Sequence, residues 1–562
     1  MNPNTETTSN YYRLPEGNPG SDRRRLPKDF ITPSIGDKAE IIEVRQGSSP
    51  PVQYSTSFVW PSSSPICFLE YDSRNIKPGT LYFALPGLHT NGHKYIPEAV
   101  KKGAATVVFE EELPEYDGNV LYIRVRDSRF AMSPLSAAFY DFPSRRMGII
   151  GVTGTEGKST TVYFIYQLLK LLGKKAGFIS TVMHGDGLND KANSEHQTTP
   201  EAPIVHRLLA EMYNNGAEYA VLESSSHGLS KKTNRLGDVD FDVGVLTNVT
   251  HEHLEFHGTF EQYRQDKAEL FRALDVSIHK KQGRQSEYTI PSFGVANADD
   301  PSAAFFAAAT DKRTYTFSTT GAEADVSSTI LESRSDGNVY EVLDASTWDT
   351  FEISDNLNGA FNAGNVLAAL ITVAKLFSIE VKVLKNLVTE LKPVRGRMNS
   401  IKKGQPFELL IDYAHTPSSF NAIFPPLRKR LDSTGGRLIS LFGSPGERDT
   451  KKRSLQGEIA ARYSDIVILA DEDPRGEDPM AILEEIEKGC LAEPRMIRNE
   501  TLFLIPNRME AIRKAFSLAQ KGDIVILLGK SHENSIIYAD GPTPYDEFEA
   551  AEKALSELGF ME

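Results

Sequence analysis

The sequence predicts an α/β protein in which helices cover mostly parallel sheets. From Met147 onward, short apolar runs alternate with helical stretches, which is typical of parallel strands joined by helices. Several of these runs end in polar residues, and open parallel sheets bind their ligands where the strands end. The chain has 562 residues, which is too long for one hydrophobic core and suggests about three domains.

Composition and spacing divide the chain into four parts. Residues 1–36 are rich in Asn, Ser, Pro and Arg and lack periodicity, so we predict a mobile tail. A small α/β domain is predicted at 37–144, a central domain at 145–392 and a last, doubly wound domain at 393–562. The strands expected in these domains are 81–85 and 105–109, then 147–152, 219–222 and 243–246, and finally 409–412, 438–442, 466–470 and 524–528.

Composition excludes several classes of function. The net charge of −14 argues against a nucleic-acid partner, because phosphate backbones need a basic surface. Cys67 and Cys490 are too few and too far apart for a disulfide scaffold. No apolar stretch approaches the ~20 residues of a membrane span, and the first residues lack the pattern of a signal peptide. We therefore expect a cytoplasmic protein without membrane contact, and we expect a monomer.

The stretch 147–161, MGIIGVTGTEGKSTT, predicts a phosphate-binding loop between a strand and an amphipathic helix. In such a loop the backbone N–H groups hold phosphates, the lysine, here Lys158, reaches the terminal ones, and the hydroxyl of Ser159 can bind Mg²⁺. Five residues instead of four separate Gly151 from Gly157, which departs from the general pattern. The flanking strand and helix still favour an ATP or GTP site over a chance Gly-Lys-Ser.

Two further segments carry possible metal ligands. Residues 223–229, ESSSHGL, place a carboxylate and hydroxyls at a strand end, and residues 251–258, HEHLEFHG, are dense in imidazoles. Both groups can bind a divalent ion, although Mg²⁺ prefers oxygen. The alternative for His251, His253 and His257 is a loop in which some of them only make hydrogen bonds. Zinc is disfavoured, because no cysteine or HExxH spacing supports it.

A longer series of motifs carries a family resemblance. The segments are Asp72–Arg74, Gly154–Thr160, Thr198–Pro200, Glu223–Leu229, Thr247–Gly258, Tyr263–Lys267, Asn297–Asp300, Gly359–Asn362, Arg395–Met398, Asp412–Pro417 and Gly446–Asp449. With these motifs the chain resembles the Mur ligase family, the ATP-dependent amide-forming enzymes of bacterial cell-wall precursor synthesis. The segments Asp72–Arg74, Glu223–Leu229 and Gly529–Glu533 make it most similar to the third-step enzymes, which add a diamino acid to UDP-N-acetylmuramoyl-L-alanyl-D-glutamate.

The resemblance implies a three-domain architecture: a small N-terminal α/β domain for the UDP-substrate, a central P-loop parallel-sheet ATPase domain, and a C-terminal Rossmann-like domain for the amino acid. It also implies that ATP phosphorylates a substrate carboxylate and that an amine attacks the acyl phosphate. The implied catalytic residues are Lys158, Lys267, Glu223, His253, Arg397 and Asp412. The implied metal ligands are Ser159, Glu223, His253 and Lys267, the last as a lysine carbamylated by CO₂ instead of a solvated helix lysine.

Other roles are carried over in the same way. For the nucleotide, the resemblance implies Gly154, Thr155, Glu156, Gly157, Lys158, Ser159, Thr160, Asn362 and Arg397. For the substrates it implies Ser73, Leu88, His89, Thr90, Thr198, Thr199, Ser225, Arg235, Arg448, Glu472, Asp473, Pro474, Arg475, Gly529 and Glu533. Glu156 departs from the family, which often has Asn or Asp there, and it adds negative charge beside the phosphates.

The sequence contains conflicting signals about which diamino acid is added. Family members that use meso-diaminopimelate commonly show Asp-Asn-Pro-Arg where this chain has residues 472–475, EDPR. Arg475 and Arg448 favour the second carboxylate of meso-diaminopimelate, whereas Asp473 suits lysine or ornithine. We predict meso-diaminopimelate because two arginines need an anion more than one aspartate needs a cation.

Two alternatives remain at this stage. The first is another ATP-dependent ligase of the same fold, either a Mur enzyme of a different step or a folylpolyglutamate synthase. The front motif Asp72–Arg74 and the late motif Gly529–Glu533 argue against the folate enzyme. The second is a non-catalytic nucleotide-binding regulator. The loss of any of four residues would have favoured it, and all four are present: Lys158, Lys267, Glu223 and Arg397.

Overall fold

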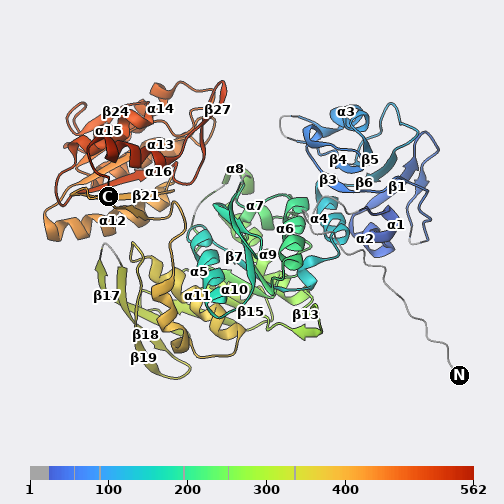
Figure 1. Cartoon of the computed structure of the whole chain (residues 1–562), viewed down its shortest axis with the longest axis horizontal. Coiled ribbons are helices and arrows are strands. Elements are labelled where there is room, and N and C mark those ends of the chain that lie inside the picture. The colour runs from blue at the N-terminus through green and yellow to red at the C-terminus, as the bar shows by residue number, and fades with distance from the viewer. Residues whose placement is uncertain are drawn as a thin grey trace.

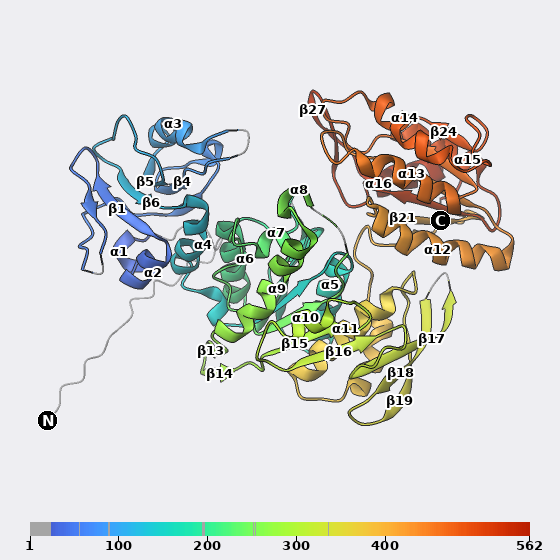
Figure 2. The same cartoon turned by 180° about the vertical axis from the view of Figure 1, so that it is seen from behind.

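The computed structural model describes residues 24–561, except 56, 88–89, 194–196, 251, 253 and 335–336. Three domains follow one another along the chain, and the central domain lies between the other two (Figure 1, and from behind in Figure 2). Each is built on one large sheet: six strands in the first domain (β1–β6), eleven in the central domain (β7–β12 and β15–β19) and six in the last (β20–β25). The α/β fold predicted from the sequence is confirmed.

The sheet of the first domain has the order β2-β1-β6-β5-β4-β3, with β3 to β6 parallel and β1 antiparallel to both neighbours. Its strands are β1 Ile41–Gln46, β2 Val52–Gln53, β3 Phe68–Glu70, β4 Thr80–Phe83, β5 Ala104–Phe109 and β6 Leu121–Val125. Its helices are α1 Pro27–Phe30, α2 Pro33–Lys38, α3 Ile96–Lys101 and α4 Ser128–Phe139, with 3₁₀ turns η1 Ser73–Asn75, η2 Gly92–Tyr95 and η3 Pro143–Arg145.

The predicted tail is wrong for residues 24–36. Phe30 on α1, Ile31 just after it and Ile35 on α2 are buried in the core of the first domain. Arg25 donates to the carbonyl of Ala138 at 3.0 Å and pairs with Asp141 at 2.8 Å, which ties this stretch to the end of α4. Three apolar residues in and beside two very short helices produce no periodicity, so the polar composition around them dominated the prediction. Residues 1–23 lie outside the described part of the chain.

The central sheet is parallel in its middle, as predicted. Strands β8, β11, β7, β12, β15, β16 and β17 run parallel in that order, and antiparallel strands extend both edges. The strands are β7 Gly148–Thr153, β8 Ala176–Ile179, β9 Met183–Gly185, β10 Asp190–Ala192, β11 Tyr219–Glu223, β12 Val243–Leu246, β13 Lys280–Gln282, β14 Glu287–Thr289, β15 Phe293–Asn297, β16 Thr314–Ser318, β17 Val326–Arg334, β18 Gly337–Asp344 and β19 Asp349–Ser354. The strands β13 and β14 form a separate hairpin.

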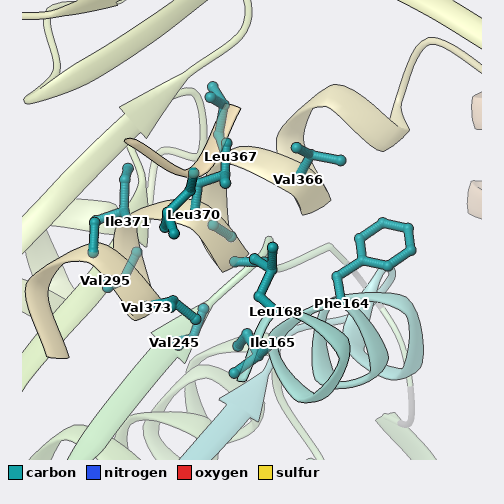
Figure 3. Close-up of a cluster of buried hydrophobic side chains, with 14 of the residues drawn as sticks. Phe164, Ile165, Leu168, Val245, Val295, Val366, Leu367, Leu370, Ile371 and Val373 are labelled. Carbon is teal, nitrogen blue, oxygen red and sulfur yellow. The ribbon is translucent and has the colours of Figure 1, made fainter. Parts of the chain in front are cut away.

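Helices cover both faces of this sheet. They are α5 Lys158–Leu171, α6 Ala202–Asn214, α7 Ser226–Leu229, α8 Leu254–His257, α9 Phe260–Val276, α10 Ala303–Ala307, α11 Asn362–Leu376 and the 3₁₀ helix η4 Val381–Glu390. On one face α5 and α11 bury Phe164, Ile165, Leu168, Leu367 and Leu370 against strand residues such as Val245 and Val295 (Figure 3). On the other face α6 and α9 pack on alternate residues of the same strands. This two-sided burial holds β7 and the start of α5 rigidly.

The last domain repeats the doubly wound plan. Strands β21, β25, β22, β23 and β24 run parallel in that order, and β20 pairs antiparallel with β21. Its strands are β20 Asn399–Ile401, β21 Glu408–Asp412, β22 Leu438–Phe442, β23 Ile466–Leu469, β24 Leu502–Leu504, β25 Ile524–Leu528, β26 Ser535–Tyr538 and β27 Gly541–Pro544. Its helices are α12 Pro417–Thr434, α13 Lys451–Tyr463, α14 Pro479–Cys490, α15 Arg508–Leu518 and α16 Glu547–Glu557. Within the described ranges, no helix is long and apolar enough to cross a membrane.

Candidate active site

A cavity of about 430 Å³ opens between the central and last domains. The central domain lines it with the phosphate loop and the ends of neighbouring strands, and the last domain lines it with the segments after β21 and β25. Of the predicted residues, the cavity gathers Thr155, Glu156, Gly157, Lys158, Ser159, Thr160, Thr198, Glu223, Asn362, Arg397, Asp412 and Glu533.

The phosphate loop is shaped by two glycines and the end of β12. Gly154 has a φ of +150°, and a Cβ there would lie 1.9 Å from the Thr247 hydroxyl oxygen, so only glycine fits. Gly157, with a φ of +82°, is the N-cap residue directly before α5. The Asn248 side-chain oxygen accepts the Glu156 N–H at 2.9 Å, and the Thr247 hydroxyl donates to the Glu156 carbonyl at 2.6 Å. The loop therefore keeps its shape through contacts with the neighbouring strand.

Lys158 is the first residue of α5, at the positive end of the helix dipole. Its Nζ donates to the Thr155 carbonyl at 2.7 Å, so the ammonium folds back over the loop. The loop thus presents a helix N-terminus and one cation at the same place, an arrangement that suits a polyphosphate.

An oxygen-rich cluster lies beside the loop, where β11 ends. The Ser159 hydroxyl donates to Glu223 Oε2 at 2.8 Å, and Thr181 donates to Glu223 through its N–H at 2.8 Å and its hydroxyl at 3.0 Å. Glu223 is buried. Within the described ranges, no group of three or more His, Cys, Asp or Glu side chains could hold a metal ion. A cation here would therefore share its ligands among one carboxylate, hydroxyls and its own waters or phosphates, which suits Mg²⁺.

Lys267 lies on α9 beneath the loop, and its side chain is buried. Its Nζ donates to the Gly154 carbonyl at 2.5 Å and lies 4.5 Å from the centre of the Tyr263 ring. Burial, followed by the nearby charge of Lys158, lowers the pKa of Lys267 well below its ordinary value. His253, predicted to lie nearby, falls outside the described residues.

The last domain contributes a charged wall to the cavity. Burial raises the pKa of Asp412, although its carboxylate accepts the N–H groups of Met398 at 2.8 Å and Ala414 at 2.7 Å. The Arg397 guanidinium lies 4.9 Å from the centre of the Tyr413 ring, and its Nη2 is 3.5 Å from the Ser159 hydroxyl. Arg397 therefore reaches from the last domain to the oxygen cluster of the central one.

A second group of predicted residues meets next to Glu223. The Thr199 hydroxyl donates to the Glu223 carbonyl at 2.9 Å and lies 2.9 Å from the Ser225 hydroxyl. Arg235 donates to the Thr199 carbonyl at 2.9 Å and to Glu201 at 2.9 Å. This chain of contacts joins the predicted sugar and peptide residues to the oxygen-rich cluster at Glu223.

The other predicted positions lie elsewhere. Ser73 and Thr90 belong to the first domain and do not line the cavity, and Leu88 and His89 are outside the described residues. Arg448 is exposed. In the last domain, the predicted residues follow the ends of β23 and β25, and one of them, Asp473, contacts a buried lysine. These residues are Glu472, Asp473, Pro474, Arg475 and Gly529.

That lysine, Lys530, was missed by sequence reasoning. Its fully buried Nζ contacts Asp473 at 2.8 Å and also contacts Glu533. Glu533 in turn accepts the Tyr413 hydroxyl at 3.0 Å. Lys530 stands inside the Gly529–Glu533 motif, so the motif could have singled it out, but its partner Asp473 is 57 residues away in sequence.

Comparisons with known proteins agree with this geometry. Three family profiles match consecutive parts of the chain: "Mur ligase family, catalytic domain" at residues 65–140, "Mur ligase middle domain" at 152–373 and "Mur ligase, glutamate ligase domain" at 396–531. A UDP-N-acetylmuramyl-tripeptide synthetase of Treponema denticola is 50% identical over 506 residues, covering 87% of this chain and 93% of that protein. The chain belongs to the Mur ligase family. It is an ATP-dependent ligase, as predicted, and the non-catalytic alternative falls away.

Two further proteins that this Mur ligase resembles are named as diaminopimelate ligases. A UDP-N-acetylmuramoyl-L-alanyl-D-glutamate–2,6-diaminopimelate ligase of Geobacillus thermodenitrificans is 36% identical, covering 88% of this chain and 95% of that one. A solved structure of a ligase with the same name has a TM-score of 0.56 at 27% identity and covers 88% of this chain and 96% of that one. The three-domain architecture is therefore that of the family.

Proposed function

We propose that this ligase joins an amino group of a diamino acid to a carboxylate of UDP-N-acetylmuramoyl-L-alanyl-D-glutamate with ATP as the energy source. One observation carries the proposal: a single cavity is lined by a phosphate loop from the central domain and by Arg397 and Glu533 from the last domain. The names of the relatives, tripeptide synthetase and diaminopimelate ligase, support this choice of substrates. In this proposal residues 145–392 bind ATP, residues 393–562 bind the amino acid and the domain before them binds the UDP end.

The reaction has two steps in this cavity. A carboxylate oxygen of the dipeptide attacks the γ-phosphorus, the bond to the leaving ADP breaks, and an acyl phosphate forms. The amino nitrogen then attacks the acyl carbon, loses a proton, and displaces phosphate. Lys158, the loop N–H groups and Arg397 would offset the charge of the transferred phosphoryl group, and Asn362 and Asp412 would hold the nucleotide from the far side of the cavity.

The residues fit Mg²⁺ as the metal that accompanies ATP. Ser159 and Glu223 supply a hydroxyl and a buried carboxylate, which are the oxygen ligands this ion prefers. When bound, Mg²⁺ would neutralise part of the negative charge of the phosphates. Arg397 approaches the same hydroxyl from the last domain and adds a second, fixed positive charge. His253 remains the predicted residue near a second metal site.

Lys267 is proposed to carry a carbamate. Burial, followed by the charge of Lys158, lowers the pKa of Lys267 well below its ordinary value, which favours the unprotonated amine that reacts with CO₂. The nitrogen bonds to the carbon of CO₂ and one proton is released, which turns a buried cation into an anion. That anion would face Lys158, whose charge otherwise repels the Lys267 ammonium.

The amino acid favoured by the site is meso-diaminopimelate. Among the described residues, Arg448 and Arg475 make no ion pair with a carboxylate, and the Nε of Arg475 is buried without a hydrogen-bond partner. Two such guanidinium groups suit a substrate with two carboxylates. Asp473 is paired with Lys530, so it does not require an ammonium from the substrate. Lysine and ornithine are the competing substrates.

A phosphate-release assay tests the function. The purified protein is given ATP, Mg²⁺ and UDP-N-acetylmuramoyl-L-alanyl-D-glutamate with meso-diaminopimelate, lysine or ornithine in turn. Mass spectrometry then identifies the product by its mass. We expect release only when nucleotide, dipeptide and amino acid are all present, with the highest kcat/KM for meso-diaminopimelate. Turnover with UDP-N-acetylmuramate, its L-alanyl derivative or a folate instead of the dipeptide would overturn the proposal. A preference for lysine or ornithine would overturn the choice of amino acid alone.

A further inference from the structure

The segments after β23 and β25 form a buried charge cluster around Lys530, a residue to which the reaction above gives no role. Lys530 has no exposed side-chain area, and its Nζ lies 2.8 Å from Asp473 Oδ1 and in contact with Glu533. Asp473 also accepts the N–H of Ile537 at 2.9 Å. Glu533 lines the cavity and accepts the Tyr413 hydroxyl at 3.0 Å. Lys530 therefore connects a carboxylate of the cavity wall to a second carboxylate behind it.

The cluster contains more acid than base. Glu472 is buried next to Asp473, and burial, reinforced by Glu533 and Asp473, raises its pKa to about 7. Its Oε2 is buried and has no hydrogen-bond donor among the residues that the structure describes. Lys530 is the cation in direct contact with both Asp473 and Glu533. The net charge of this cluster, and so the electrostatic field it exerts on a substrate in the cavity, therefore depends on whether Lys530 compensates Asp473.

We propose that Lys530 is a specificity-determining residue for the amino acid, because it cancels the charge of Asp473 and so allows a second substrate carboxylate to approach. An aspartate without this partner would be a nearly buried anion, which repels a carboxylate and attracts an ammonium group. The net charge of the Lys530–Asp473 pair, and not Asp473 alone, then sets the choice between the two kinds of diamino acid. This inference rests on the proposed function.

Lysine and meso-diaminopimelate make a suitable pair of probes, since they differ by one carboxylate. The quantity to measure is the ratio of kcat/KM for meso-diaminopimelate over that for lysine. If one amino acid is not turned over, its affinity is measured as the inhibition constant in the reaction with the other amino acid. We expect Glu533 to hold an amino group that both probes share. Loss of its contact with Lys530 should therefore change both constants and leave the ratio unchanged.

Four proteins form a charge cycle: the parent with a pair charge of zero, Lys530→Met with −1, Asp473→Asn with +1, and the double variant with zero again. We expect Lys530→Met to shift the ratio about tenfold or more toward lysine and Asp473→Asn to shift it in the opposite direction. The double variant should return to the parent ratio. Lys429→Met removes an exposed lysine of the same domain and should leave the ratio unchanged.

The results separate the possible failures. Single variants that shift the ratio in the same direction, or a double variant that does not return, would overturn the role of Lys530. A general packing defect lowers the activity on both amino acids together and leaves the ratio unchanged. If Lys530→Met is unstable, the Asp473→Asn variant still tests the direction in which the ratio shifts. A parent protein that binds and uses neither amino acid would instead overturn the proposed function itself.

Discussion

Replacing Glu156 by Gln should remove a pH dependence from nucleotide binding. Glu156 lies in the phosphate loop, and burial, followed by the charge of Glu252, raises its pKa to about 7 against the opposing effects of Lys158 and Arg397, while Asp412 raises it further. Its carboxylate is therefore largely protonated below pH 7 and becomes an anion above it. An anion inside the loop opposes triphosphate binding, so ATP should bind more tightly to the protonated form.

The pKa sets the size of the effect. With a value of about 7, the ionised fraction of Glu156 is about 10% at pH 6 and about 90% at pH 8. If only the protonated form accepts ATP, the Kd rises about tenfold over this interval. The free energy of unfolding should change in the same direction. The folded state binds this proton more tightly than the unfolded chain, so the contribution of Glu156 to stability falls as the pH rises from about 4.5 to about 7.

The assay is calorimetric titration of both proteins with a non-hydrolysable ATP analogue and Mg²⁺ at pH 6, 7 and 8. The parent and Glu156→Gln are compared at each pH. The titration of the nucleotide is common to both proteins, so it cancels when the Kd of one is divided by the Kd of the other. We expect this quotient to change about tenfold between pH 6 and pH 8. Parallel pH profiles for the two proteins would refute the reasoning.

Other expectations follow from the same contacts. Lys158→Ala should lower kcat by ~10²–10³-fold, because it removes a cation that offsets phosphate charge, and activity within a few-fold of the parent in the phosphate-release assay would contradict the role of the loop. A crystal structure with metal and nucleotide should show density beyond Nζ of Lys267; a plain ammonium there would exclude the carbamate. Scattering should show a more compact molecule when ATP and dipeptide are both present, since the cavity wall comes from two domains; unchanged profiles would exclude closure. Lys281→Met should lower the free energy of unfolding by about 3–5 kcal/mol, because Lys281 and Asp242 form a fully buried pair at 2.8 Å; a melting temperature equal to that of the parent would contradict this.

Local patterns in the sequence were enough to predict β7, β11 and β12 of the central sheet and β21, β22, β23 and β25 of the last one. The run 438–442 is β22, 524–528 is β25 and 243–246 is β12, because a buried parallel strand is an uninterrupted apolar segment with polar residues on both sides. The same patterns did not predict α1 and α2, which are too short to show a period, or the parallel strands β8, β15, β16 and β24. They also did not predict β17 to β19, which complete one side of the central sheet. Most residues of β17 are exposed, so its sequence is largely polar and resembles a loop.

For the site, the motifs named which residues to examine, and only the folded chain decided how they are paired. The phosphate loop could be read directly, because its glycines, lysine and serine are consecutive and their geometry is local. The partners of Lys267 and Lys530 could not, because they come from 113 and 57 residues away in sequence. Asp473 read alone is an anion that disfavours a second carboxylate; paired with Lys530 in a buried crevice it is half of a neutral pair. Charge in a protein interior depends on the nearest opposite charge, and that neighbour is chosen by tertiary structure.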